Sequence, residues 1–307
     1  MRPTLRQNIV SSTLTLPLCS VACAVVWMLP DVRSASLWGG LAVATLTTYL
    51  LLEMVNRNQL LRIRSRMVSA TFVCWLAACP FLHPLGWHFV PALAVAGSLF
   101  LLLSSYQEER AVHSVYHAFL LLSLGSAFFP PLICLVPLYY AAMSVQLRSM
   151  SWRALGASLL GVLTPLWFGL AWMLLSGQAE HVAAHFAPWL SYRLPDYGSL
   201  PARFWVNAAF LLWQLLLGLT HYYRTNFNDK IRVRMCYYVI MLLEAAFVAG
   251  LFLFPDHFPT LYLLLILCGS PLVGHYYTLA RGGAWMTAWF LLNLLLLIAL
   301  GVYNHLF

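Results

Sequence analysis

The chain has 307 residues, of which 62% are hydrophobic and 8% are charged, and its formal net charge is +8. Such a chain has too little polar surface to cover a soluble globule of this length, which excludes an ordinary soluble enzyme or binding domain. Its cations lie in short segments between apolar runs and form no continuous basic stripe with interleaved aromatic residues, so nucleic acid is not the expected partner. The apolar runs show no dominant period of two, so they predict membrane-spanning helices and not a barrel.

The first 30 residues predict an uncleaved membrane span. Two arginines within Met1–Arg6 precede an apolar run that is too long for the apolar part of a signal peptide, and no cleavage site is convincing. In all, eleven apolar runs cover about residues 9–29, 36–54, 67–83, 88–105, 114–128, 131–146, 154–176, 203–221, 236–254, 259–280 and 284–303. Because about 20 apolar residues in a helix cross a bilayer, the sequence predicts an all-α polytopic transmembrane bundle, a single domain over residues 1–307.

The prolines Pro130 and Pro131 decide how many crossings are predicted. They separate two short apolar runs, and they predict either a tight hairpin of two crossings or one kinked helix. With a cytoplasmic N-terminus, the hairpin places 14 of the 17 Lys and Arg residues inside and 3 outside, which follows the positive-inside rule. We therefore predict a bacterial inner-membrane protein with a cytoplasmic N-terminus and about eleven crossings, or ten if the hairpin does not span.

Two cationic decamers have matching sequences. Asn58–Met67 and Asn226–Met235 each contain an asparagine, three further residues, a cation and then Ile-Arg-x-Arg-Met. After each decamer come an apolar run and a turn with two prolines four residues apart and a histidine between them, at Pro80–Pro84 and Pro255–Pro259. The matches predict a parallel internal repeat with halves at about 36–128 and 203–303.

The decamers and a nearby pair of arginines are the predicted anion site. Guanidinium groups bind phosphate through two parallel hydrogen bonds, and this chain has a single lysine. The alternative is that these cations anchor the helices to anionic lipid headgroups, at about 1 kcal/mol per cation. Anchoring does not require the repeated asparagines. The candidate residues are Asn58, Arg62, Arg64, Arg66, Asn226, Lys230, Arg232, Arg234, Arg148 and Arg153.

Glu244 lies near the middle of an apolar run. A carboxylate at that depth costs roughly 2.5–3.5 kcal/mol, so it should face the bundle interior and be paired, be protonated or lie on a substrate path. A buried structural hydrogen bond is the other interpretation. His181 and His185 are four residues apart, but a metal site would need a third ligand. The sequence predicts no metal and no cofactor.

Three segments carry a resemblance to a known family. Arg62–Met67, Phe128–Pro131 and Arg148–Arg153 resemble segments of an uncharacterised family of polytopic inner-membrane proteins found in Bacteroidota. The resemblance implies a polytopic membrane fold over most of the chain. It implies no activity and assigns no functional residue.

The sequence supports three functional hypotheses. The first is transport or handling of an anionic or lipid-linked substrate, with membrane lipids as partners. The second is a membrane-embedded transferase acting on a polyprenyl-phosphate carrier, and the third is a noncatalytic subunit of an envelope complex. A water-accessible cavity from the arginines to Glu244 would favour transport, and a lateral groove beside a carboxylate would favour a transferase. A bundle with neither, and with Glu244 paired, would favour the subunit.

Overall fold

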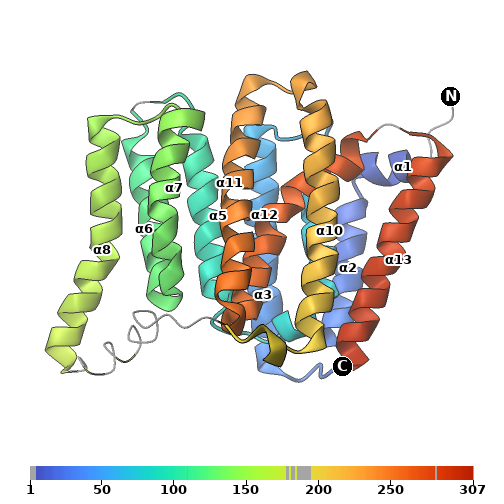
Figure 1. The fold of residues 1–307 in the computed structure, drawn as a ribbon, viewed down its shortest axis with the longest axis horizontal. Helices are drawn as coiled ribbons and strands as arrows, with labels where there is room; N and C mark the ends of the chain where they lie inside the picture. The colour runs from blue at the N-terminus through green and yellow to red at the C-terminus, as the bar shows by residue number, and fades with distance from the viewer. Residues whose placement is uncertain are drawn as a thin grey trace.

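The computed structural model describes residues 5–108, 110–177, 180, 184, 195–280 and 282–306, and in these residues the chain forms twelve α-helices. The helices stand side by side, and from α2 onward consecutive helices run in opposite directions (Figure 1). The helices are α1 (Leu5–Ser11), α2 (Thr15–Met28), α3 (Ala35–Asn58), α4 (Met67–Ala77), α5 (Phe89–Ser104), α6 (Val112–Phe128), α7 (Leu135–Ala141), α8 (Trp152–Ser176), α10 (Ala202–Thr225), α11 (Ile231–Leu253), α12 (Phe258–Leu279) and α13 (Ala284–Leu306).

Six of the described helices are long and apolar enough to cross a membrane, namely α3, α8, α10, α11, α12 and α13. Helices α1 and α2 meet at 89° and make a seventh span if they are counted together. The other apolar helices have 10–17 residues and reach only about 15–26 Å at 1.5 Å per residue. The predicted multi-pass helical membrane protein is thereby confirmed. By length alone, six or seven spans and not eleven are shown.

Helices α6 and α7 form a hairpin at the two prolines. Pro130 begins a 3-10 turn over Pro130–Cys134, and the far ends of the hairpin meet where the Gln107 amide donates to the Leu147 carbonyl at 2.8 Å. The Ser105 hydroxyl also donates to Ser149 Oγ at 3.2 Å. The chain therefore turns back at this point, as predicted, and is not one kinked helix.

Helix α12 is the centre of the bundle. Every residue from Leu261 to Thr278 is buried, because α4, α5, α10 and α11 pack around the helix. The approach to α4 is close at Gly274, where a Cβ atom would lie 2.7 Å from the Cα atom of Val68. Small residues permit such contacts between membrane helices, where packing and not the hydrophobic effect holds neighbours together.

Two pairs of buried amides join α13 to α10. Asn207 and Asn304 donate to each other's side-chain oxygens at 2.8 and 2.9 Å, and Gln214 donates to Asn293 at 2.8 Å. The outer face of α13 carries exposed leucines. Side-chain hydrogen bonds of this kind contribute about 0.6–2 kcal/mol each between membrane helices, so the amides fix the position of a peripheral helix.

The two predicted repeat units are alike in one segment and different in another. The proline turns Pro80–Leu82 and Pro255–His257 are both 3-10 turns. The first decamer is a loop after α3 that ends at the start of α4, whereas the second places its arginines on α11. Among the described residues no repeat is therefore shown, and the halves at 36–128 and 203–303 stay a prediction.

His83 is buried in the turn between α4 and α5. Its Nε2 lies 3.1 Å from the Leu76 carbonyl oxygen, and its ring stacks on Trp27 with centroids 4.1 Å apart. Burial lowers the pKa of His83 from its ordinary value of 6.5 to about 4. The neutral imidazole is therefore part of the folded structure.

We expect the protein to lose stability as the pH falls from about 6.5 to about 4. Over this range the unfolded chain binds a proton at His83 that the folded protein does not, so the stabilisation is complete above the unfolded pKa and is lost below it, by on the order of 3 kcal/mol. Thermal unfolding of the detergent-solubilised protein at a series of pH values measures the effect. His83→Gln should flatten the pH dependence, and the exposed His113 gives a matched control, His113→Gln. An equal pH dependence in both variants would contradict the assignment.

Candidate functional site

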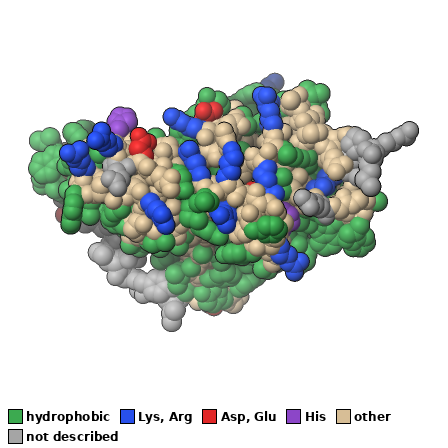
Figure 2. Space-filling view, turned by 90° about the horizontal axis from the view of Figure 1, so that it is seen from above, with side chains coloured by type: hydrophobic (Ala, Val, Ile, Leu, Met, Phe, Trp, Pro, Cys, Tyr) green, Lys and Arg blue, Asp and Glu red, His purple; other side chains and the backbone are tan. Residues whose placement is uncertain are grey.

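The cations gather at one end of the bundle, which we call the cationic end. It comprises α1 and the connections at 59–66, 105–111, 147–151 and 226–230, which lie at the top of Figure 1, and Figure 2 shows lysine and arginine side chains spread over it. Of the 14 cations predicted to share one side of the membrane, Arg2 and Arg281 lie outside the described residues, and the other twelve lie in these segments or in the helix turns next to them, which we include in the cationic end. Arg33 and Arg203 lie at the opposite end, and Arg193 is outside the described residues.

The two decamers contact each other at the cationic end. Arg62 Nε donates to Asp229 Oδ1 at 2.5 Å, and Arg232 Nη2 donates to Asn58 Oδ1 at 3.1 Å. Lys230 Nζ also donates to the side chain of Gln59 at 3.3 Å. The structure thus brings together two segments of matching sequence that lie 168 positions apart. Their polar side chains contact mainly each other.

Asp229 is the centre of this contact. Its side chain is fully buried, and its second oxygen lies 3.4 Å from His275 Nε2. Burial by itself would raise the pKa of Asp229, but the hydrogen bonds from His275 and Arg62 outweigh it and hold the pKa below its ordinary value. Arg62 donates further to the Thr225 carbonyl at 2.9 Å. Arg62 therefore neutralises a carboxylate of this chain.

The other candidate cations have no carboxylate partner among the described residues. Arg64 is exposed, and Arg66 donates weakly to the Thr13 carbonyl at 3.4 Å. Arg234 Nε is buried with no hydrogen-bond partner in the described part of the chain. Arg148 and Arg153 are exposed near the start of α8. Their role as anion ligands stays a prediction.

The repeated asparagines have different surroundings. Asn58 is buried at the end of α3, where its amide donates to the Met54 carbonyl at 3.0 Å and its oxygen accepts from Arg232. Asn226 begins a 3-10 turn and contacts the Tyr238 hydroxyl at 3.4 Å. Asn58 thus ends α3 and holds the second decamer, whereas Asn226 caps the C-terminus of α10 and contacts Tyr238 of α11.

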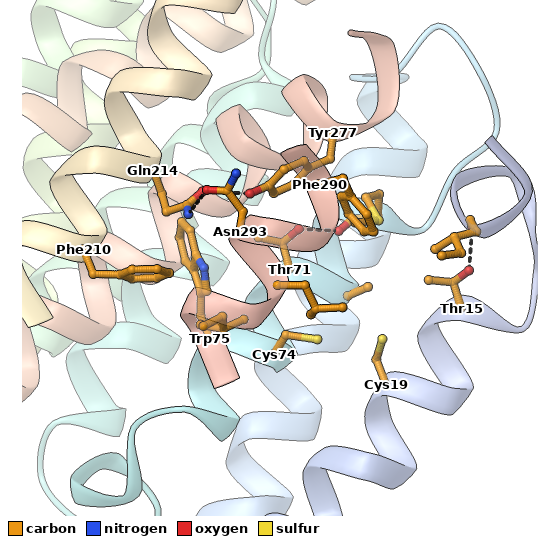
Figure 3. A pocket seen from close by; sticks show the side chains of 15 residues that line it. Thr15, Cys19, Thr71, Cys74, Trp75, Phe210, Gln214, Tyr277, Phe290 and Asn293 are labelled. Carbon is orange, nitrogen blue, oxygen red and sulfur yellow. Dashed lines mark hydrogen bonds between the residues drawn. The ribbon is translucent and has the colours of Figure 1, made fainter. Parts of the chain in front are cut away.

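An apolar pocket of about 230 Å³ lies between α2, α4, α10, α12 and α13 (Figure 3). One wall carries a chain of hydrogen bonds in which Tyr277 donates to Gln214 and Gln214 donates to Asn293, both at 2.8 Å. The remaining lining is mostly apolar: Ile9, Thr15, Cys19, Met67, Ala70, Thr71, Cys74, Trp75, Phe210, Phe290, Leu294 and Leu297. Because its amides bond to one another, the pocket offers a ligand chiefly apolar contacts.

The apolar pocket opens toward the side of the bundle and reaches the cationic end. Its rim includes Leu294, which is exposed on the outer face of α13, and the half-buried Thr15 on α2. Ile9 and Met67 line it near the cationic end, and Met67 directly follows Arg66. The guanidinium of Arg66 donates to the Thr13 carbonyl at 3.4 Å, so this cation lies near the lining residues Met67 and Thr15 but does not itself line the pocket.

A second, polar cleft of about 400 Å³ lies at the cationic end. Its lining residues are Arg6, Gln7, Val10, Ser11, Ile63, Thr278, Leu279, Ala280 and Gly282. Arg6 is 3% exposed, and its two terminal nitrogens donate to the carbonyls of Tyr277 and Ala280 at 2.7 and 2.6 Å. Nothing in the sequence indicates this role, because the sequence predicts for Arg6 only that it lies on the cytoplasmic side with the other cations. Two residues of the first decamer line these cavities: Ile63 lines the polar cleft, and Met67 lines the apolar pocket.

Glu244 is buried within α11, as predicted, and neither carboxylate oxygen has a hydrogen-bond partner among the described residues. It faces Gly269 of α12, where a Cβ atom would lie 3.4 Å from Oε1 of Glu244 and 3.4 Å from the Trp75 indole. Trp75 also lines the apolar pocket. Glu244 and Trp75 thus both lie beside Gly269, and the structural hydrogen bond considered for Glu244 is not found in the described part of the chain.

The histidines considered for a metal, His181 and His185, lie outside the described residues. Within the described ranges, no group of three His, Cys, Asp or Glu side chains is placed to hold a metal ion.

Comparisons with known proteins identify no family for the chain. It matches no protein-family model, no curated protein and no solved structure. The resemblance to inner-membrane proteins of Bacteroidota therefore stays a prediction, and the chain is a multi-span helical membrane protein.

Proposed function

We propose that the protein handles a phosphate-bearing lipid, with the apolar chain of the lipid in the pocket between α2, α4 and α13. The observation that carries the proposal is the position of this pocket, which is lined by the exposed Leu294 at the side of the bundle and by Met67, the residue after Arg66, at the cationic end. A ligand bound there would meet apolar walls along its chain and positive charge at its head. Apolar burial supplies roughly 25 cal/mol per Å², and cations near a membrane surface attract anionic headgroups.

The proposal includes an orientation in a bacterial inner membrane. The twelve described cations of the cationic end, together with Arg2 and Arg281, would face the cytoplasm, in keeping with the positive-inside rule. The alternation of helix directions from α2 to α13 supports eleven crossings, the short helices being accommodated within the bundle. A fusion reporter at the C-terminus, expected on the outer side, tests the orientation.

A transferase acting on a polyprenyl-phosphate carrier is the second candidate. It is favoured by the position of Glu244, which lies beside Gly269 together with Trp75, a residue that lines the apolar pocket. Transport would need an aqueous route from the decamers to Glu244, and neither pocket connects the two. Both the lipid-handling protein and the transferase would bind a phosphate-bearing lipid. Binding of such a lipid in the apolar pocket is therefore the first property to test.

Filling the apolar pocket should remove the lipid. Cys74 lines the pocket and is half-buried, whereas Cys134 is exposed at the turn between α6 and α7. We expect the wild-type protein to retain a phosphate-bearing lipid through detergent purification, as measured by native mass spectrometry. Cys74→Trp should lose most of this lipid because the indole occupies the volume of its chain. Cys134→Trp should retain it.

The measurement requires that both variants are folded, which gel filtration and thermal unfolding verify. Equal lipid retention in the two tryptophan variants would exclude the pocket as the binding site. A purified wild-type protein without any lipid, and unable to take one up from anionic vesicles, would refute the proposed function and leave the noncatalytic subunit.

A further inference from the structure

We propose that the polar cleft at Arg6 is the binding site for the phosphate of this lipid. The inference rests on the proposed function, and it locates the headgroup in the cleft and not at the paired decamers. The geometry that supports it is the position of α1, which lies between the polar cleft and the apolar pocket.

The first argument is the missing counter-charge of Arg6. A buried guanidinium group is costly unless an anion compensates it, and Arg6 has no carboxylate within salt-bridge distance among the described residues. Its contacts are the last carbonyls of α12, and a helix C-terminus carries only about half a negative charge. About half of the charge on Arg6 therefore remains for a ligand to neutralise.

The carboxylate of Asp229 does not remove this deficit. His221 lies within electrostatic range of Arg6, Arg62 and Asp229, but Asp229 is already shared between Arg62 and His275. Among the described lining residues of the cleft, Arg6 is the only charged side chain and none is a carboxylate. The cleft thus has a local excess of positive charge.

The second argument is the set of polar groups around the cleft. The Thr278 hydroxyl is buried and has no hydrogen-bond partner among the described residues, and Arg6 Nε is in the same situation. Ser11 lies at the exposed rim, where its hydroxyl donates to the Gln7 carbonyl at 2.8 Å. Phosphate oxygens accept hydrogen bonds from guanidinium and hydroxyl groups, and Arg6, Ser11 and Thr278 all line the cleft.

The third argument is continuity with the apolar pocket. Neighbouring residues of α1 line different sites, since Ile9 faces the pocket and Val10 faces the cleft. On α12, likewise, Tyr277 lines the pocket and the next residue, Thr278, lines the cleft. A lipid whose headgroup lies in the cleft would therefore need to pass only the edge of α1 to place its chain in the pocket.

The test compares lipids that differ only in the phosphate. Full-length protein in nanodiscs is titrated with dioleoyl phosphatidic acid and with dioleoylglycerol, and bound lipid is counted by native mass spectrometry. We expect Arg6→Gln to weaken phosphatidic acid binding by about tenfold, the worth of one hydrogen bond to a charged group, and to leave dioleoylglycerol unchanged. Arg6→Lys should restore part of the preference. Arg153→Gln, at an exposed cation of the same end, is the matched control.

Two results would overturn the assignment. If Arg6→Gln weakens both lipids equally, Arg6 only holds α1 on α12 and does not bind phosphate. If Arg66→Gln removes the preference for phosphatidic acid while Arg6→Gln does not, the phosphate lies at the mouth of the apolar pocket.

Failure of the proposed function gives a different result. If neither lipid binds the wild-type protein, inorganic phosphate is titrated and followed by the width of its phosphorus resonance. Broadening that Arg6→Gln abolishes supports an anion site at the cleft without a lipid role. No broadening refutes the cleft as well.

Discussion

Asp229→Ala is expected to destabilise the protein by roughly 1.5–3 kcal/mol, the worth of a hydrogen bond to a charged group, because the Asp229 carboxylate is fully buried while the Arg62 side chain is 31% exposed. Asp229 is fully buried and accepts from both Arg62 and His275. Its loss leaves the Arg62 charge without a counter-ion and removes the main contact between the two decamers. Denaturant unfolding in detergent, followed by tryptophan fluorescence, measures the change.

The double variant Arg62→Leu/Asp229→Leu is the control for this interpretation. Replacing both partners removes the charge and the need to neutralise it, so the double variant should be more stable than Asp229→Ala. Lys230→Ala, at the exposed neighbouring cation, should have little effect. An Asp229→Ala protein as stable as the wild type would show that the decamers are held together by other contacts.

Glu244→Met is expected to stabilise the protein, by about 1–3 kcal/mol. The carboxyl group of Glu244 has no hydrogen-bond partner among the described residues, and a buried polar group in this state costs about that amount. Methionine has a similar length and fits irregular apolar space. The same unfolding measurement applies, with Glu244→Gln as the variant that keeps the shape and polarity.

The two variants separate a structural role from a functional one. If Glu244→Met is more stable and Glu244→Gln is not, the carboxyl group is retained at a cost to stability, as expected for a functional group in a membrane. If Glu244→Met is less stable, the carboxyl has a stabilising partner, and the interpretation of an unpaired acid is wrong.

Part of the site could be predicted from sequence because charge and proline act locally. The positions of the cations between apolar runs predicted that they would share one end of the bundle, and the described residues do so. The prolines Pro130 and Pro131 predicted the hairpin. The matching decamers are predicted to belong to one anion site, and they do contact each other, although binding of an anion stays a prediction.

The rest depends on partners that are distant in the chain. Arg62 is a candidate anion ligand in the sequence because guanidinium groups bind phosphate. The sequence does not show that Asp229, 167 positions later, accepts a hydrogen bond from Arg62. Arg6 lies 271 positions from the Tyr277 carbonyl that it contacts. The buried amides gave a weak signal, because Asn207 and Gln214 are seven residues apart and lie on one face of α10. That signal indicates a polar contact but does not name α13.

The central position of α12 has a consequence for biogenesis. Helices α4, α5, α10 and α11 all pack on α12, yet α12 follows all four of them in the chain and leaves the ribosome after them. Until α12 is inserted, the faces of these helices that pack on α12 can be covered only by lipid or by the insertion machinery. A chain that stops before Phe258 would contain ten of the twelve described helices and still lack the element that joins them, so we expect quality-control proteases to remove it. Assembly is thus a late event, completed when the C-terminal hairpin of α12 and α13 enters.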